Sequence, residues 1–563
     1  MSRAYATRRS FIGGGCAISL AALASQWRMA EAAPSAREQS LCYWCTWGVQ
    51  NALCRMPGAP GRPVFSGDQG DGSLLARNSM SEALLFGEGG WSRTMFPKSR
   101  MDILLMLDDG WDVPFGADPR KSIRPFGALA PAAARFPELG ASGAERLKNL
   151  DSRVKDNGWR GTALWVACQS EGEGNGVRFD ERRTRAEWRR RMEQSGEAGI
   201  WYWKVDWGCR DGDVDYRRLV CEVRDEVCPG LIVEHKPLSR TRPFNGLKFP
   251  DGGGCVGTGR IFRPEDSACA DWSKTDIGRL LMFSDVVRIY DTLQPVEVAT
   301  SFDRIAYYGM VADKVGSKSV LNVEDCVVAG AVLGHAFGIM RVPGVVGGIY
   351  GAAPDVSHIC SRIAEVDRAV AWQRFAPAFG GRADSPTRFS ESVLVDEWRY
   401  QRNEGWLAAA WGRLVRQGAP AAISRGMALP EVRSLEAETP FVAAMRHPNG
   451  SVSVGTFPRC VGGRYWTPRA EVILDEAPVD GQPLGVFGEM SALRFKNGFA
   501  GHGLSVFARD LAGGELHDIT NMVTKTDGGA TIPGDVLAAI GREAAPGDIH
   551  SAPGVLVFSS VGR

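Results

Sequence analysis

The stretch Leu104–Trp111 reads LLMLDDGW, and the stretch Ile200–Gly208 reads IWYWKVDWG. In both, a short apolar run leads directly into acidic residues, which predicts a buried β-strand that ends at a polar site. In a (β/α)8 barrel, the loops at the carboxyl ends of the strands converge over one pocket. Carboxylates on two such strand ends would share that pocket, so the two stretches together favour a TIM barrel.

The residue types in these stretches also indicate chemistry. Lys204 and Asp206 are two residues apart, so on an extended strand their side chains point to the same face and the ammonium keeps the carboxylate ionised. That arrangement is typical of a nucleophile or an electrostatic stabiliser. Asp108 and Asp109 lie where a strand becomes a loop, and paired acids beside tryptophan suit sugar hydroxyls and the apolar face of a sugar ring. The alternative, a surface turn and a surface ion pair, is disfavoured by the apolar flanks.

These residues resemble the clan of retaining α-galactosidases, glycoside hydrolase families 27 and 36. Members carry a D-D-G-[WYF] motif after the second barrel strand and a K-x-D motif after the fourth. The matching residues here are Asp108–Trp111 and Lys204–Asp206. The resemblance covers about residues 40 to 375. It implies that Asp206 is the nucleophile and that Lys204, Asp108, Asp109 and Trp111 bind the sugar.

The same resemblance implies an arginine shortly before the acid/base aspartate on the sixth strand. The segment Ser284–Asp291 reads SDVVRIYD and offers Arg288 and Asp291. The spacing between them is one residue shorter than in the α-galactosidases of family 27, and Asp285 is the alternative acid/base. Arg288 is expected to orient the sugar or the acid/base.

Other predicted strand ends add candidate sugar contacts. Trp47 ends the first strand and would form a wall of the sugar subsite. Glu234, followed by His235 and Lys236, ends the fifth strand, where members of the family place a residue that contacts the sugar. The seventh strand ends in polar residues that suit a ligand contact and a helix cap equally: Asn322, Glu324 and Asp325.

Composition narrows the class of ligand. The net charge is +1, and neither sign forms a long block, which argues against nucleic acid or a membrane surface as a partner. A neutral carbohydrate is the natural substrate class, and the chain holds 17 tryptophans. The expected reaction needs no metal and no cofactor. The single CxxC at Cys42–Cys45 is a weak metal signal, and Cys221 and Cys228 could pair or remain packed thiols.

The 563 residues suggest three segments. Residues 1–35 resemble a twin-arginine signal peptide, with Arg8 and Arg9 before an apolar stretch, so we expect export to the periplasm or beyond. Residues 36–375 would form the barrel. Residues 376–563 alternate in short segments that predict one or more antiparallel β-sandwich domains. The Gly-rich 252–259 segment is expected to be a flexible rim loop.

The eight barrel strands are expected at Leu41–Trp47, Ile103–Leu107, Thr162–Cys168, Gly199–Asp206, Leu231–Glu234, Val286–Tyr290, Ser319–Val323 and Phe337–Arg341. Helices are expected at Arg182–Ser195, Tyr216–Val227, Asp276–Phe283 and Glu297–Ala312. Strands of the C-terminal region are expected at Ser392–Glu397, Trp406–Trp411, Ser451–Thr456 and Leu504–Ala508.

Several functions fit this pattern. The first is hydrolysis of terminal α-D-galactosides with retention at the anomeric carbon. Related enzymes that act on β-L-arabinopyranosides, α-N-acetylgalactosaminides or α-glucans are alternatives, and a bulky residue near Asp109 would favour arabinopyranose because that sugar lacks the C6 hydroxymethyl group. A non-catalytic glycan-binding barrel is a further alternative. A cofactor-loaded redox enzyme is disfavoured, since the chain has neither a dinucleotide fingerprint nor cysteine spacing for an iron–sulfur cluster.

Overall fold

The computed structural model describes residues 41–50, 69–174, 178–236, 253–256, 274–289, 295–342, 362–399, 414–479, 481–498, 504–525 and 528–561. The predicted signal peptide and the predicted strand Trp406–Trp411 lie outside these residues.

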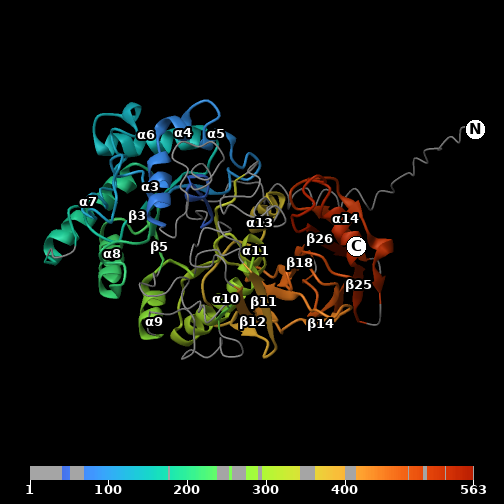
Figure 1. Ribbon diagram of the computed structural model, residues 1–563. Helices are drawn as coiled ribbons and strands as arrows, with labels where there is room; N and C mark the ends of the chain where they lie inside the picture. Colours follow the sequence, from blue (N-terminus) through green and yellow to red (C-terminus); the bar gives the residue numbers. More distant parts are fainter. Residues whose placement is uncertain are drawn as a thin grey trace, which may run out of the picture.

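Eight parallel strands form the barrel (Figure 1). They are β1 (Tyr43–Cys45), β2 (Leu104–Leu107), β3 (Thr162–Val166), β4 (Tyr202–Val205), β5 (Ile232–His235), β7 (Val286–Arg288), β8 (Val320–Asn322) and β9 (Gly338–Ile339). The sheet runs in the order β8-β7-β5-β4-β3-β2-β1-β9, and a parallel bridge between Asn322 and Ala336 closes the ring. Each strand coincides with one predicted from an apolar run, so the (β/α)8 barrel is confirmed.

Helices alternate with these strands and surround the barrel: α3 (Gln69–Ser79), α4 (Glu82–Phe86), α5 (Trp91–Thr94), α6 (Gly143–Asp156), α7 (Glu181–Glu197), α8 (Val214–Val227), α9 (Lys274–Phe283), α10 (Glu297–Val315), α11 (Val327–Leu333) and α13 (Ala364–Gln373). Sequence-local caps set several of their ends. The side chains of Ser142, Asp180 and Asp213 accept a backbone N–H in the first turns of α6, α7 and α8. Gly316 ends α10 in the left-handed conformation, φ 65°, which glycine adopts without strain.

The C-terminal region forms two facing sheets, which we call the β-domain. The first holds β10 (Thr387–Phe389), β13 (Ala422–Arg425), β15 (Phe441–Arg446), β16 (Val452–Phe457), β20 (Leu484–Phe487), β26 (Gly554–Val561), β22 (Leu504–Asp510) and β23 (His517–Asp518). The second holds β14 (Glu431–Ser434), β19 (Ala470–Glu476), β21 (Ala492–Asn497), β25 (Ala530–Pro533) and β24 (Thr524–Lys525). A short helix, α14 (Gly534–Ile540), follows β25, and β17 (Arg459–Val461) pairs with β18 (Arg464–Trp466).

Alternating side chains on the first sheet bury both of its faces. On β15, Phe441 and Ala443 belong to the main core that includes the barrel, whereas Val442 and Ala444 belong to a second core shared with the five-stranded sheet. This period of two is the pattern that predicted a sandwich. The sheets are mixed and not purely antiparallel, because β13–β15, β16–β20 and β19–β21 pair in parallel. In each of these pairs the chain makes a further element between the two strands, which lets it return in the same direction.

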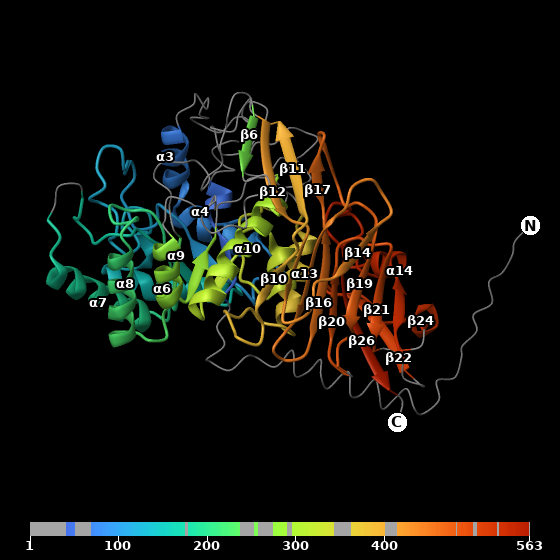
Figure 2. The same ribbon diagram turned by 90° about the horizontal axis from the view of Figure 1, so that it is seen from below.

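One segment of the barrel chain joins a further, three-stranded sheet with two strands of the C-terminal region. Gly253–Val256 forms strand β6, which pairs in parallel with β12 (Leu414–Pro420), itself antiparallel to β11 (Val393–Arg399). Figure 2 shows β6 beside β12 and β11. The expectation that this Gly-rich stretch is only a flexible rim loop is therefore wrong, since its backbone N–H and C=O groups pair with the edge of a sheet. We keep the predicted domain boundary near residue 375 as a proposal; α13 ends at Gln373 and β10 starts at Thr387.

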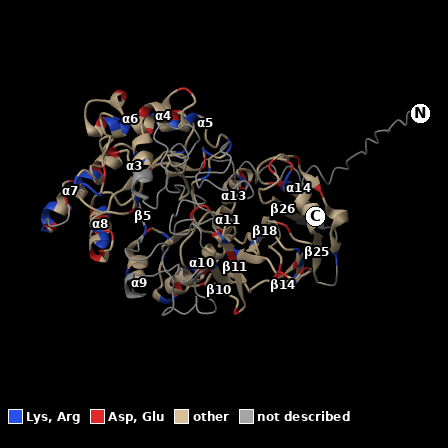
Figure 3. Cartoon of the chain, viewed as in Figure 1, with Lys and Arg blue, Asp and Glu red and all other residues tan. Residues whose placement is uncertain are grey.

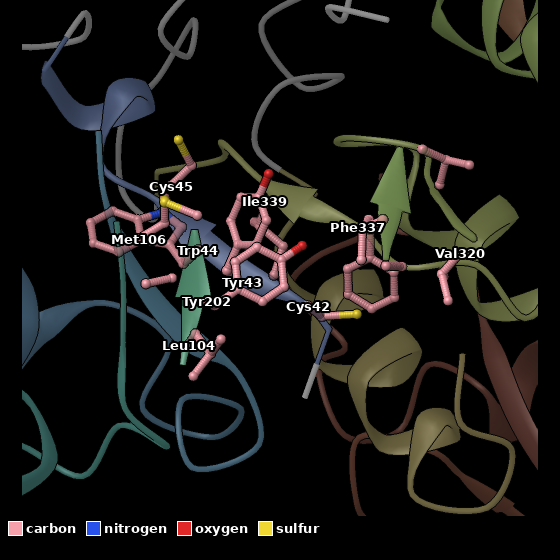
Figure 4. Packing of buried hydrophobic residues seen from close by; sticks show 14 of the residues in the cluster. Cys42, Tyr43, Trp44, Cys45, Leu104, Met106, Tyr202, Val320, Phe337 and Ile339 are labelled. Carbon is pink, nitrogen blue, oxygen red and sulfur yellow. The ribbon is translucent and has the colours of Figure 1, made fainter. Parts of the chain in front are cut away.

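Buried aromatic side chains fill the barrel and its surroundings. Trp44, Trp111, Trp165 and Trp203 are completely buried, so much of the tryptophan excess is core. The ring centroids of Tyr43 and Tyr202 are 5.5 Å apart, and Figure 4 shows the two side chains close together.

The eight cysteines whose side chains are described are free thiols, including Cys221 and Cys228. The thiols of Cys42 and Cys45 contact different groups, the Gln373 amide and the Asp108 carboxylate. The CxxC sequence therefore does not form a chelating pair. Among the described side chains, no group of three or more His, Cys, Asp or Glu residues is arranged to hold a metal ion.

Basic and acidic residues are interspersed along the described chain (Figure 3). On α7 and α8, for example, Arg185 pairs with Glu222 and Arg189 pairs with Glu226. No helix in the described ranges has the length and apolar character needed to span a bilayer.

Candidate active site

The Asp206 carboxylate directly follows β4 and lies among cationic side chains. Lys204 Nζ is 3.6 Å from Oδ2, and Lys236 Nζ, which follows β5, is 3.7 Å from Oδ1. Trp165 on β3 donates its indole N–H to Oδ2 at 3.0 Å. The carboxylate is buried, and its Oδ1 accepts no hydrogen bond from the residues that the structure describes. The protein thus orients one oxygen through Trp165, while the other has no hydrogen-bond donor among the described residues.

This environment decides the protonation state of Asp206. Burial alone would raise the pKa of its carboxyl group, but the charges of Lys236, Lys204 and Arg288 and the Trp165 hydrogen bond lower the pKa to about 2. The carboxylate is therefore ionised at neutral pH. An ionised carboxylate with one unbonded oxygen can attack a carbon or stabilise a cation, but it cannot donate a proton.

Lys204 links Asp206 to the acidic pair after β2. Its Nζ donates to Asp108 Oδ2 at 2.7 Å, and the Cys45 thiol donates to the same oxygen at 3.0 Å. Burial is the largest single effect and disfavours the ammonium form, yet the charge of Asp108, together with further groups that include Asp206, raises the pKa of Lys204 above its ordinary value. The predicted juxtaposition of the two acidic motifs is thus present, with Lys204 between the carboxylates.

Asp109 is held from another direction. Arg77 on α3 donates from Nε to Oδ1 at 2.8 Å and from Nη2 to Oδ2 at 2.7 Å, and both side chains are buried. Burial raises the pKa of Asp109, and Arg77 only partly offsets it. The Arg77 guanidinium carbon also lies 5.2 Å from the ring centroid of Phe126 and 5.9 Å from that of Trp207. A bulky cation therefore occupies the surroundings of Asp109.

The two tryptophans predicted to contact sugar lie in different environments. Trp111 is fully buried, and its indole N–H donates to the backbone carbonyl of Trp165 at 2.9 Å. It thereby supports the residue that holds Asp206. Trp47 follows β1 in a short helical turn, is half-buried and packs against the main core.

Below the candidate site, Glu234 organises a fully buried network. Its carboxylate accepts the hydroxyl protons of Tyr43 at 2.8 Å and Tyr202 at 2.7 Å, and the Asn322 amide at 2.7 Å. The Tyr43 hydroxyl also accepts a hydrogen bond from Arg288 Nη1 at 2.7 Å. Three protein donors thus bind Glu234 in this structure, and through the Tyr43 hydroxyl the network reaches Arg288.

Arg288, the last residue of β7, forms a buried ion pair with Glu324, which follows β8. Glu324 has φ 53°, a left-handed conformation that a bulky side chain rarely adopts and that is often found at functional sites. Of the two acids after β8, Asp325 bonds instead to the Met340 backbone and to Arg341. Of the polar residues after β8, Glu324 therefore contacts the site, and Asp325 supports the next strand.

The two candidates for the acid/base residue fare differently. Asp285 precedes β7 and so lies at the amino end of the barrel, where it pairs with Arg224 and accepts the Val233 backbone N–H at 2.8 Å. That position is opposite to the candidate site, so Asp285 does not share a pocket with Asp206. Asp291 lies outside the described residues.

Three residues of the site were missed from the sequence: Arg77, Trp165 and Tyr43. Trp165 and Tyr43 sit on strands that were predicted, and the signal that was available is their position on the inward-facing side near the strand ends. No local signal marks Arg77, because its contact with Asp109 depends on how α3 packs over the barrel.

The fold and site define a (β/α)8 barrel that carries a buried acidic site at the carboxyl ends of its strands and is joined to a β-domain. No family model matches the chain, and no curated protein does.

Solved structures similar to the chain include a glycoside hydrolase family 27 β-L-arabinopyranosidase from Geobacillus stearothermophilus, with 10% identity over 93% of this chain and 96% of that chain and a TM-score of 0.34. A variant of that enzyme in complex with arabinose matches with 10% identity over 80% and 88% of the two chains and a TM-score of 0.32. The α-galactosidase I of Mortierella vinacea matches with 10% identity over 93% and 98%, also at a TM-score of 0.32. Likenesses this distant do not by themselves assign an activity to the chain.

Proposed function

We propose that this protein is a retaining glycoside hydrolase that removes a terminal α-D-galactosyl residue or a stereochemically related sugar. The observation that carries the proposal is the Asp206 carboxylate at the end of a barrel strand. It is buried, ionised and oriented through one oxygen by Trp165, and its other oxygen accepts no hydrogen bond from the described residues. The resemblance of the D-D-G-W and K-V-D motifs to families 27 and 36 supports the choice of sugar.

The proposed reaction has two displacements. Asp206 Oδ1 attacks the anomeric carbon, and the bond from that carbon to the departing oxygen breaks as the acid/base residue protonates this oxygen. In the second step the acid/base residue removes a proton from water, which attacks the anomeric carbon and releases Asp206. Two inversions leave the configuration unchanged.

Asp291 is the proposed acid/base residue. Its role rests on the sequence resemblance and on the position of Asp285 at the opposite end of the barrel. Asp108 and Lys204 are proposed to bind sugar hydroxyls, and Arg288, fixed by Glu324 and Tyr43, is proposed to orient the sugar or the acid/base. The proposed reaction uses no cofactor.

A second sugar is favoured by one observation. The Arg77 guanidinium occupies both oxygens of Asp109 and lies against Phe126 and Trp207, so the surroundings of this acid are crowded. A pentopyranose needs less room than a hexopyranose, because it lacks the C6 hydroxymethyl group. β-L-arabinopyranoside is therefore the second candidate substrate.

The test is release of nitrophenol from a panel of p-nitrophenyl glycosides by the wild type and by the variants Asp206→Ala and Asp291→Ala. We expect turnover of the α-D-galactoside or the β-L-arabinopyranoside, with a loss of at least about a thousandfold in Asp206→Ala, since a covalent nucleophile has no substitute in the site. Azide should restore turnover in one variant only, and the anomer of the glycosyl azide formed identifies the nucleophile.

Asp285→Ala is the matched control, because Asp285 is the other acid of the same segment and lies at the opposite end of the barrel. We expect this variant to keep its turnover. If the wild type hydrolyses no glycoside of the panel but binds the sugars, the barrel is a glycan-binding protein and the catalytic proposal fails.

Export is part of the proposal and rests on the sequence of residues 1–35. Expression in a bacterial host with and without a functional twin-arginine translocase tests it. Periplasmic protein that disappears in the translocase mutant supports this route, and cytoplasmic retention in both hosts contradicts it.

A further inference from the structure

A cavity of about 810 Å³, partly open to solvent, lies where the barrel meets the β-domain. The barrel contributes the first turns of α10 and α11 and Arg341, which follows β9; the β-domain contributes the ends of β16 and β18 and the loop before β26. Figure 1 shows α11 and α13 beside β18 and β26 in this region. The residues that line the cavity do not include Asp206, Lys204 or Asp108, so this space is separate from the candidate active site.

The charges along the cavity are balanced. Three guanidinium groups and three carboxylates of the lining form ion pairs with one another: Arg341 with Glu365, Arg362 with Glu297, and Arg542 with Glu489. Because each positive charge of the lining is paired with a negative one, the electrostatic potential in the cavity favours neither anions nor cations. It does offer both acceptors and donors to a neutral ligand that carries hydroxyl groups.

Aromatic and apolar groups complete the lining. Trp466 is half-buried, the Arg464 guanidinium lies 4.1 Å from its ring centroid, and its indole N–H donates to Glu436 Oε2 at 3.2 Å. These contacts hold the ring in place before any ligand arrives. The Tyr465 hydroxyl accepts a hydrogen bond from Arg362 at 2.9 Å. Ile549 is 67% exposed at the rim and offers an apolar contact.

We propose that this cavity is a second, non-catalytic carbohydrate-binding site that takes neutral sugar units of an oligosaccharide or polysaccharide. A sugar ring has apolar C–H faces and hydroxyl groups at its edge. The C–H faces suit the fixed indole and the exposed isoleucine, and the hydroxyl groups suit the balanced ion pairs. The proposal rests on the proposed function for the class of glycan, but the binding itself requires no catalysis.

The test uses the full-length variant Asp206→Asn as the parent, so that hydrolysis does not consume the ligand. Its mobility is measured in native gels that contain soluble galactomannan, arabinogalactan or pullulan over a range of concentrations. We expect at least one polymer to retard the parent. Adding Trp466→Ala should weaken that retardation about tenfold, because removing an aromatic anchor from a binding site commonly costs this much.

Two exposed aliphatic residues of the β-domain provide a matched pair. Ile549→Ser changes the rim of the cavity, whereas Val479→Ser changes a residue that is 62% exposed and does not line it. We expect the first change to weaken the retardation. The second change should leave the retardation equal to that of the parent. Because both residues are exposed, these variants remain informative even if Trp466→Ala fails to fold.

Two results overturn the proposal: no retardation of the parent by any of the three polymers, or equal retardation of the parent and the Ile549→Ser variant. The gel assay needs no turnover, so it tests the second site even if the proposed hydrolysis is not found. Conversely, if the wild type hydrolyses glycosides while no polymer retards the Asp206→Asn variant, that result refutes the second site and leaves the proposed hydrolysis intact.

Discussion

The variant Lys236→Met tests how the charge on Asp206 is maintained. Lys236 is the strongest of the charges that lower the pKa of Asp206, and its Nζ lies 3.7 Å from Oδ1. Lys204 is a poorer choice because it also bridges Asp108, so its removal would affect two buried carboxylates at once. Methionine keeps the length and apolar stem of lysine and removes only the charge.

The magnitude follows from the separation of the charges. Two unit charges about 4 Å apart interact by about 4 kcal/mol at an effective dielectric constant of 20, which is about three pKa units. The Lys236 side chain is 13% exposed, so solvent reduces this value, and one neighbouring charge commonly moves a carboxyl pKa by about 1–3 units. We therefore expect the pKa of Asp206 to rise from about 2 to between about 3 and 5.

The assay is the pH dependence of kcat/KM for the best p-nitrophenyl glycoside, since this ratio reports ionisations of the free enzyme. In the wild type, the ionised nucleophile should persist to the lowest pH at which the protein stays folded. In Lys236→Met, activity should fall on the acid side with a midpoint between about pH 3 and 5. The basic limb belongs to the acid/base residue and should move less.

Two controls separate charge from other effects. Lys236→Arg keeps the positive charge and should leave the acid limb in place. Lys155→Met removes a lysine that pairs with Asp151 on α6, away from the site, and should also leave the acid limb of the pH profile in place. If Lys236→Met is active but its acid limb coincides with that of the wild type, Asp206 is not the titrating nucleophile and the reasoning is refuted.

The same shift has a consequence for folding. In an unfolded chain an aspartate has a pKa of about 3.9, so lowering the pKa of Asp206 to about 2 contributes on the order of 2–3 kcal/mol to stability. This contribution is fully present above about pH 4 and is lost as the pH falls through about 2. The stability difference between the wild type and Lys236→Met should therefore be largest near neutral pH and should shrink in acid.

Three further predictions concern buried charges. Lys204→Met should lower the free energy of unfolding in urea by about 3–5 kcal/mol, and adding Asp108→Asn should recover part of this loss, because the unpaired carboxylate is then removed. Asp510→Ala breaks a buried pair with Arg368 that joins α13 to β22, and a loss of similar size is expected in the same measurement, whereas the exposed Asp384→Ala should change stability little. Arg77→Ala should raise kcat/KM for the α-D-galactoside relative to the β-L-arabinopyranoside about tenfold, if the arginine restricts room at C6; an unchanged ratio contradicts this.

The positions of the barrel strands could be predicted because each strand is an apolar run between polar segments. This signal is local, so the eight predicted strands all match observed ones; most observed strands are shorter, and β5 has the predicted length but is shifted by one residue. The pairing of Gly253–Val256 with β12 could not be predicted, since its partner lies about 160 residues later in the chain, from Leu414 onward. Strand pairing over such a distance depends on tertiary packing, not on local composition.

The sequence by itself determined that Asp108, Lys204 and Asp206 lie together, because the carboxyl ends of parallel strands meet at one face of a barrel. Only the tertiary structure decided what each group does there. Glu234 lies on a predicted strand, but its buried hydrogen bonds to Tyr43 and Asn322 join strands that are far apart in the sequence. They therefore depend on the closed barrel. The Arg77 contact with Asp109 and the lowered pKa of Asp206 likewise depend on separations of a few ångströms between distant segments, because hydrogen bonds and charge interactions weaken steeply with distance.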